Sequence, residues 1–261
     1  MGEVIAITSG KGGVGKTTFA VNIGCGLAMM SKKVLIIDGN NGLRNLEAAM
    51  GLSDFAFYNF IDYMNGKNEL KEVVIKDNRF EKLFVIPAAQ VCNENILNAT
   101  KMKEIYETLK EKFDYVIIDT PSGVSNGFIS SIMGVDKSII ISSPDVLSIR
   151  NADKIKKILL EKGVRNIAVI INKIDDELRK KGIYLSNKDI DDLLGLEIIG
   201  EFNYDIEFPI SFSKGEPLVN SDTDSGKKIC NLCEKISDGK IILPFAEKNQ
   251  DKKLFNFFRK K

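Results

Sequence analysis

EVIAITSGKGGVGKTT, residues 3–18, joins an apolar run to a glycine-rich loop. The run is residues 4–7, residues 10–17 fit the pattern G-x-x-x-x-G-K-[ST], and a helical pattern starts at Lys16. In a strand–loop–helix unit of this kind, backbone N–H groups and the helix N-terminus converge on phosphate oxygens. A flexible glycine turn would need neither the strand before it nor the helix after it. The segment therefore predicts a P-loop that binds the phosphates of a nucleotide.

Beyond this segment, short β-branched runs alternate with stretches of helical period. The runs lie at residues 34–37, 83–86, 116–118, 139–141 and 167–171, and helices are expected at 16–30, 101–112, 151–161, 187–194 and 226–236. Because the runs lack polar alternation, we expect strands covered on both faces, as in a parallel sheet with crossover helices on each side. The sequence predicts an α/β fold, a single doubly wound, mostly parallel sheet P-loop NTPase domain with helices on both faces. It would span residues 1–245, followed by a polar linker at 246–251 and an amphipathic tail at 252–261.

The composition limits the chemistry and the partners. The 261 residues carry a formal net charge of +1, so we expect no nucleic-acid partner. The chain has no histidine, so catalysis must use lysine, aspartate, asparagine and backbone groups. No apolar run approaches the roughly 18 residues that span a bilayer, and no basic-then-apolar leader precedes the first strand. We therefore expect a cytoplasmic protein.

Several side chains have expected functions at the phosphates. Lys16 should reach the β- and γ-phosphates, Thr17 should ligate Mg²⁺, and Thr18 should lie near the α-phosphate. Asp38 and Asp119 each end an apolar run. Because the carboxyl ends of parallel strands meet at one edge of a sheet, these two carboxylates should also serve Mg²⁺.

Lys11 has no function in an ordinary P-loop. The pattern K-G-G-x-G-K-[ST] at residues 11–17 resembles that of the deviant Walker A ATPases. The resemblance implies that Lys11 crosses a dimer interface to the partner's ATP and stabilises charge there, as an arginine finger does. It also implies that Asn172 hydrogen-bonds the adenine edge. The implied ATP-binding residues are Gly10, Lys11, Gly12, Gly13, Val14, Gly15, Lys16, Thr17, Thr18 and Asn172, and the implied catalytic residues are Lys11, Lys16, Asn40 and Asp119.

Within that class the chain resembles the MinD family, which positions the division septum. The resemblance covers nearly the whole chain and is carried by residues 8–18, by GLRNL at 42–46, by LFVIPAAQ at 83–90 and by GEP at 215–217. It implies a homodimer that forms on binding ATP with Mg²⁺, peripheral binding to an anionic membrane surface at the inner face of the cell membrane, and recruitment of a division inhibitor of the MinC type. A topological regulator, MinE-like or DivIVA-linked, is a further implied partner.

Two positions depart from that family. Asn40 and Asn151 stand where the family carries aspartates, the first orienting the attacking water and the second pairing with the lysine that corresponds to Lys11. An amide can hold a water but cannot accept its proton. The loop Asn203-Tyr204-Asp205 also departs from the family's usual proline and acid. We expect intact ATP binding and slow hydrolysis.

The last ten residues have an interfacial pattern. At 100° per residue, Leu254, Phe255, Phe257 and Phe258 fall on one arc, and basic residues flank it. The sequence predicts a membrane-surface helix that is too short to span a bilayer. A helix docked on its own domain is the alternative.

Three other functions remain open at this point. A flagellar-number regulator of the same superfamily is the nearest. A ParA-like segregation ATPase would need a basic surface, for which Lys154, Lys156, Lys157 and Lys162 are candidates. An iron–sulfur carrier could use Cys230 and Cys233, although cysteines at this helical spacing more often pack in a core, as we expect of Cys25 and Cys92.

Overall fold

A computed structural model describes residues 1–40, 45–89 and 99–239. These described residues form one sheet of eight strands in the order β3-β4-β2-β5-β1-β6-β7-β8. All neighbouring strands are parallel except β3 and β4. The strands are β1 (Glu3–Thr8), β2 (Val34–Asp38), β3 (Ile75–Lys76), β4 (Leu83–Ile86), β5 (Tyr115–Asp119), β6 (Lys137–Ser142), β7 (Asn166–Ile174) and β8 (Glu197–Asn203).

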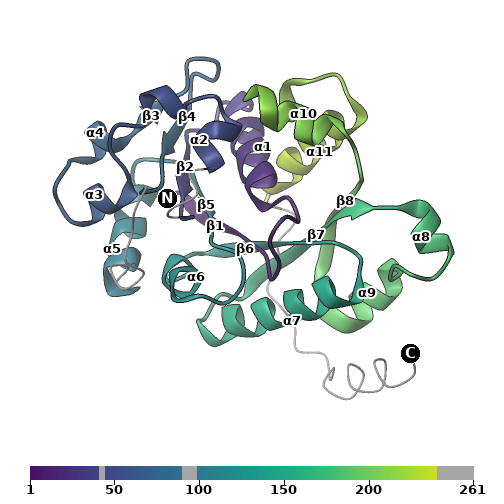
Figure 1. Cartoon of the computed structure of the whole chain (residues 1–261). Coiled ribbons are helices and arrows are strands. Elements are labelled where there is room, and N and C mark those ends of the chain that lie inside the picture. Colours follow the sequence, from purple (N-terminus) through teal and green to yellow (C-terminus); the bar gives the residue numbers. More distant parts are fainter. Residues whose placement is uncertain (41–44, 90–98, 240–261) are drawn as a thin grey trace.

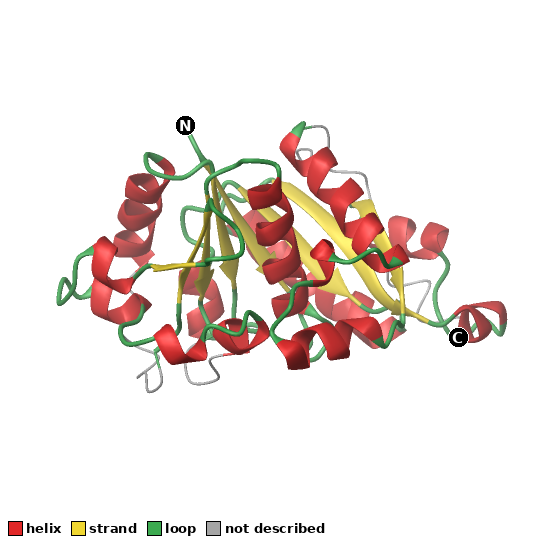
Figure 2. Ribbon diagram, turned by 90° about the horizontal axis from the view of Figure 1, so that it is seen from above, coloured by secondary structure: helices red, strands yellow, loops and turns green. Residues whose placement is uncertain are grey.

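Helices cover both faces of the sheet (Figure 1). They are α1 (Lys16–Met29), α2 (Asn45–Ala49), α3 (Phe60–Met64), α4 (Leu70–Val73), α5 (Ala99–Lys110), α6 (Asn126–Ser131), α7 (Val146–Glu161), α8 (Asp176–Lys180), α9 (Asn187–Leu194), α10 (Glu207–Lys214) and α11 (Asp224–Ser237), with the 3-10 turns η1 (Ser53–Phe55) and η3 (Leu218–Asn220). Figure 2 shows the helices along both sides of the twisted strands. The predicted doubly wound α/β fold is confirmed.

The core consists of two apolar clusters, one on each face of the sheet. Alternate residues of β1 divide between them, since Val4 and Ala6 pack with α5, α6, α7 and α9, whereas Ile5 and Ile7 pack with α1, α2 and α11. A strand buried on both faces has no polar alternation. That burial explains why the central strands read as unbroken apolar runs.

The six predicted strands are all present, and the two strands that were not predicted, β3 and β8, are the edge strands of the sheet. β8 was not predicted, because it is an edge strand with half-buried and exposed positions and a glycine at its centre. α10 was not predicted either, because Pro209 interrupts its pattern. α7 begins five residues before the predicted start, where the Asp145 side chain accepts a hydrogen bond from the Ser148 N–H and caps the helix.

Some predictions concern residues outside the described ranges. These are the domain boundary at residue 245, the linker at 246–251, the tail at 252–261, Cys92, part of the GLRNL segment and Gln90 of the LFVIPAAQ segment. In the parts of the chain that the structure covers, none of the helices combines the length and the apolar character needed to cross a bilayer.

Candidate functional site

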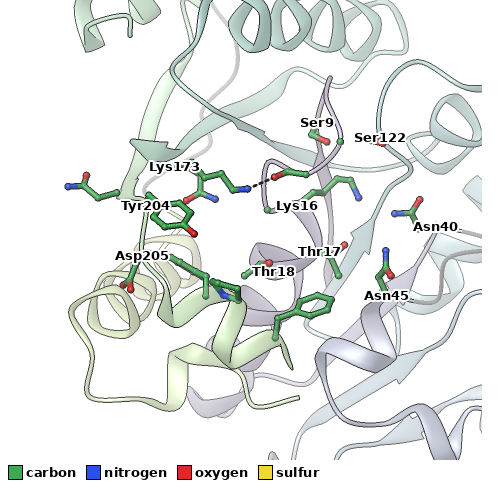
Figure 3. A pocket seen from close by; sticks show the side chains of 18 residues that line it. Ser9, Lys16, Thr17, Thr18, Asn40, Asn45, Ser122, Lys173, Tyr204 and Asp205 are labelled. Atoms are coloured by element: carbon green, nitrogen blue, oxygen red, sulfur yellow. Dashed lines mark hydrogen bonds between the residues drawn. The ribbon is translucent and has the colours of Figure 1, made fainter. Parts of the chain in front are cut away.

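A cavity of about 500 Å³ opens at the carboxyl edge of the sheet, between the P-loop and α10. This edge, beside the point where the chain turns from one half of the sheet to the other, is where doubly wound proteins bind ligands. In Figure 3, Asn40, Asn45 and Ser122 lie at one end, Lys16 and Thr17 at the middle, and Tyr204 and Asp205 at the other end. We call the end beside Asn40 the phosphate end and the end beside Tyr204 the base end.

The P-loop requires glycine at its last turn. Gly15 has a φ of 102°, and a Cβ at this position would lie 2.6 Å from the Nδ2 atom of Asn172. Only glycine adopts this conformation without strain. The next two side chains both donate to the same carboxylate: Lys16 Nζ donates to Asp119 Oδ1 at 2.7 Å, and Thr17 Oγ1 donates to Asp119 Oδ2 at 2.6 Å. The predicted Walker B aspartate therefore meets the P-loop directly.

Asp38 lies beside Asp119, because their strands β2 and β5 pair with these two residues in register. Its carboxylate is fully buried and accepts hydrogen bonds from the backbone N–H groups of Asn40 (2.8 Å) and Leu46 (3.3 Å). Burial, followed by repulsion from Asp119, raises the pKa of Asp38 to about 8. A cation bound between the two groups would favour the ionised form of Asp38.

The donor set at this end suits a hard cation and a polyanion. Thr17, Asp38 and Asp119 offer only oxygen atoms, which Mg²⁺ prefers and which it supplements with water and phosphate oxygens. The Ser9 hydroxyl is buried in the cavity wall and has no hydrogen-bond partner among the described residues. A polar ligand at this end would satisfy it. The residues present therefore fit Mg²⁺ and a nucleotide phosphate.

The other end of the cavity is aromatic. Tyr204, Phe208 and Phe212 line it, and the Phe208 ring lies 5.9 Å from Phe19 between ring centroids. Flat apolar walls of this kind suit a nucleobase. Asn172 also lines the cavity, and its Nδ2 atom donates to the Val14 carbonyl at 2.9 Å. Asn172 is thus part of the cavity wall and is tied to the P-loop, and its contact with the adenine edge stays a prediction.

Lys11 does not line the cavity. Its side chain is 51% exposed, and its Nζ lies 3.7 Å from Asp145 Oδ2. Partial burial alone would raise the pKa of Asp145, but hydrogen bonds from Ser143 and Ser148, together with the charge of Lys11, lower it. A stable carboxylate therefore balances the charge of Lys11 within the same chain.

Asn151 packs behind the P-loop. A Cβ at Gly10 would lie 2.6 Å from the Asn151 backbone and Cβ, so that α7 and the loop are in close contact. The amide at 151 carries no charge that could neutralise Lys11, and among the described residues of this chain the carboxylate of Asp145 lies nearest to the lysine as a counter-charge. Asn40 and Thr18 both line the cavity, and the function of Asn40 near an attacking water stays a prediction.

Sequence reasoning missed several residues of the cavity. Asn45, Ser122, Lys173, Tyr204 and Phe208 all line it. Tyr204 stood in a loop already noted for departing from the family. The only sequence signal for Lys173 was weak: it directly follows the predicted adenine-side asparagine, Asn172. Its left-handed backbone, with a φ of 58°, cannot be read from the sequence.

The cysteine pair and one lysine of the basic set on α7 are structural. Cys233 is fully buried and its Sγ lies 3.7 Å from the Ile23 carbonyl in α1, and Cys230 Sγ lies 3.4 Å from the Val219 carbonyl. A cluster held between subunits needs thiolates at the surface, so this pair does not fit an iron–sulfur carrier. In the basic set on α7, the buried Lys156 pairs with Asp153 at 2.9 Å and donates to the Leu194 carbonyl at 2.8 Å. That lysine therefore serves the fold and not a nucleic-acid surface.

A Walker B aspartate in contact with the lysine and threonine of a P-loop defines the class of P-loop NTPases. A family model described as an AAA domain matches residues 2–181. A septum site-determining protein MinD of Synechocystis sp. is 39% identical over 219 residues, or 84% of this chain and 82% of the relative. The structure of a MinD cell division protein from Aquifex aeolicus is 36% identical with a TM-score of 0.82, and the match covers 90% of this chain and 97% of that one.

A second structure, of a MinC:MinD cell division protein complex from Aquifex aeolicus, is 36% identical with a TM-score of 0.81 and covers 94% and 99% of the two chains. The chain belongs to the MinD family of septum site-determining ATPases.

Proposed function

We propose that this chain is an ATP-dependent switch that dimerises, attaches to the inner face of the cell membrane and recruits a division inhibitor of the MinC type, which positions the septum. The observation that carries the proposal is the place of Lys11. This lysine belongs to the P-loop, yet it lies outside the cavity and half of its side chain is exposed. It is therefore available to a nucleotide bound by another chain.

The site of one protomer holds ATP and Mg²⁺. The N–H groups of residues 10–18 bind the phosphates, Thr17, Asp38 and Asp119 serve Mg²⁺, and Asn172 fixes the adenine edge. The metal supplies positive charge that neutralises the β- and γ-phosphates and the two adjacent carboxylates. Lys16 contacts Asp119 at 2.7 Å, and it exchanges this carboxylate for phosphate oxygens when the nucleotide binds.

Dimerisation exchanges the partner of Lys11. In one protomer its ammonium is 3.7 Å from Asp145, a distance at the long limit of an ion pair, and both side chains are accessible. Such a pair contributes little stability. A phosphate of higher charge in a face-to-face protomer competes with Asp145 for the same lysine. ATP bound in both protomers thus stabilises the dimer, and Lys11 stabilises the charge that develops on hydrolysis in its partner.

Hydrolysis in the isolated dimer is slow. Asn40 lines the phosphate end, where its amide can orient a water but cannot accept the proton that the water loses. The ATP-bound form consequently persists long enough to hold a partner protein. The MinC:MinD complex of Aquifex aeolicus supports an inhibitor of the MinC type as that partner. A topological regulator, MinE-like or DivIVA-linked, would then control the release of the dimer from the membrane or its position in the cell.

A mixing experiment tests whether Lys11 acts across the interface. One chain carries Lys11→Ala with Asn40→Asp, and the other carries Asn40→Ala. Only a mixed dimer contains a site that has both the carboxylate at position 40 and a lysine 11 from its partner. We expect the mixture to hydrolyse ATP faster than the sum of the separate chains. A rate equal to that sum would mean that Lys11 does not act in trans.

The membrane part of the proposal rests on residues 252–261, which lie outside the described ranges. Two amphipathic tails on one dimer bind with a raised effective concentration, so that ATP-driven pairing becomes membrane attachment. Co-sedimentation with anionic vesicles and ATP tests this with Phe255→Glu and Phe258→Glu together. The matched control is Phe55→Glu with Phe57→Glu, two phenylalanines that are 55% and 82% exposed on the folded domain. Equal pelleting of the tail variant and the unmodified chain would rule out the tail as the anchor.

A further inference from the structure

Lys173 has an unusual backbone at the carboxyl end of β7. Its φ of 58° is left-handed, a conformation that costs energy in a residue with a Cβ and that persists where the surrounding structure enforces it. The pairing of β7 with β8 shifts register between Ile171 and Ile174, which marks an irregularity at residues 172 and 173. Irregularities of this kind re-aim side chains next to functional sites.

The irregularity brings two consecutive side chains to the same loop. In a regular strand, Asn172 and Lys173 would point to opposite faces of the sheet. Here Asn172 Nδ2 donates to the Val14 carbonyl at 2.9 Å, and Lys173 Nζ donates to the Gly13 carbonyl at 2.7 Å. Figure 3 shows the lysine reaching across to the loop. Both bonds connect β7 to the segment that precedes Lys16.

Both bonds are accepted by backbone carbonyls of the P-loop, whereas the phosphates are bound by its backbone N–H groups. A loop that turns successive N–H groups toward an anion must turn the carbonyls away from it. The Gly13 carbonyl belongs to a residue with a φ of 73°, which has no side chain to fix its orientation. A charge-assisted hydrogen bond from Lys173 supplies that restraint from outside the loop.

We propose that Lys173 is a positioning residue of the phosphate site, which holds the Gly13 carbonyl against β7 so that the N–H groups of the loop stay turned toward the phosphates. This inference rests on the proposed function, because it assigns a further residue to the same ATP site.

Lys173→Gly separates the positioning function from folding. Glycine adopts the left-handed backbone freely, so this variant should be at least as stable to heat as the unmodified chain. It loses the ammonium, so its affinity for a non-hydrolysable ATP analogue with Mg²⁺, measured by titration calorimetry, should fall about tenfold. Lys173→Arg keeps a cationic donor and should retain most of the affinity. Lys181→Ala removes the same charge from an exposed position past α8 and should change nothing.

Hydrogen exchange provides a readout that needs no nucleotide. The amides of residues 13–16 should exchange faster in Lys173→Gly than in the unmodified chain or in Lys181→Ala. Unchanged affinity in Lys173→Gly overturns the inference, and so does reduced affinity with unchanged exchange, because the lysine would then act on the nucleotide directly. Failure of the unmodified chain to bind the analogue would instead remove the proposed function, and the exchange rates alone would then decide the inference.

Discussion

Arg79 joins three segments that support the cavity walls, and its removal should be costly. Its Nε and Nη2 donate to the two carboxylate oxygens of Asp77 at 3.0 and 2.6 Å. The same side chain donates to the carbonyls of Met50 and Gly215, both at 2.6 Å. Met50 follows α2 and Gly215 follows α10, and these two helices carry the cavity residues Asn45 and Phe208.

The cost of Arg79→Leu follows from the burial of its partner. The Asp77 carboxylate is 1% exposed, so the variant leaves a buried charge without its cation. Breaking a fully buried pair costs about 3–5 kcal/mol, and because the Arg79 side chain is 39% exposed we expect a reduced cost of about 2–3 kcal/mol. In a chain of this size that corresponds to a fall of about 4–12 °C in Tm.

A double-mutant cycle, with unfolding followed by circular dichroism, measures the interaction energy between Asp77 and Arg79. Asp77→Leu with Arg79→Leu removes both charges, so its free energy of unfolding should be reduced by clearly less than the sum of the two single variants. Arg165→Leu, at an exposed position between α7 and β7, is the control and should stay within about 0.5 kcal/mol. The reasoning is refuted if Arg79→Leu behaves like Arg165→Leu, or if the two single effects simply add.

Three further substitutions test the phosphate end. Gly15→Ala should reduce ATP affinity more than tenfold, because the added Cβ would lie 2.6 Å from the Nδ2 atom of Asn172. Gly163→Ala is the control: Gly163 also has a positive φ, of 86°, but a Cβ there would meet nothing within 4 Å, so this variant should affect stability only. Asp38→Asn should stabilise the Mg²⁺-free protein, and its gain in Tm over the unmodified chain should grow from pH 5 to pH 9. The raised pKa of about 8 means that the folded state favours the protonated acid, so stability is lost as pH rises from the ordinary value of 3.8 to about 8 and levels off above that pH, and a pH-independent gain would contradict this. Asn40→Asp should raise ATP turnover by about 10²-fold, with Asn65→Asp at an exposed position as an unchanged control, and an unaltered rate would show that no carboxylate is missing.

The central strands and the metal end could be predicted because local pattern and topology coincide there. Each buried strand is an apolar run, and Asp38 and Asp119 follow two of them, so that parallel pairing brings the carboxylates together. Lys16 and Thr17 come from a motif whose spacing fixes their geometry.

The base end of the cavity and the contacts that Lys173, Arg79 and Asp145 make around it could not be predicted, because they depend on tertiary context. Lys173 reaches Gly13 through an irregularity in β7, 160 residues along the chain, and Arg79 binds carbonyls that are 29 and 136 residues away. Backbone carbonyls carry no sequence signal. Asp145 was not predicted as the partner of Lys11 for the same reason, since its placement depends on the cap of α7.

The central claim is that ATP joins two copies of this chain through Lys11, and sedimentation velocity tests it most directly. With Mg²⁺ and a non-hydrolysable ATP analogue, the species of 29.0 kDa should be replaced by one of about twice that mass, whereas Lys11→Ala should remain monomeric. Lys67→Ala, at an exposed position remote from the P-loop in sequence, serves as the control and should dimerise normally. Equal masses with and without the analogue, or an equally stable dimer in Lys11→Ala, would contradict the account.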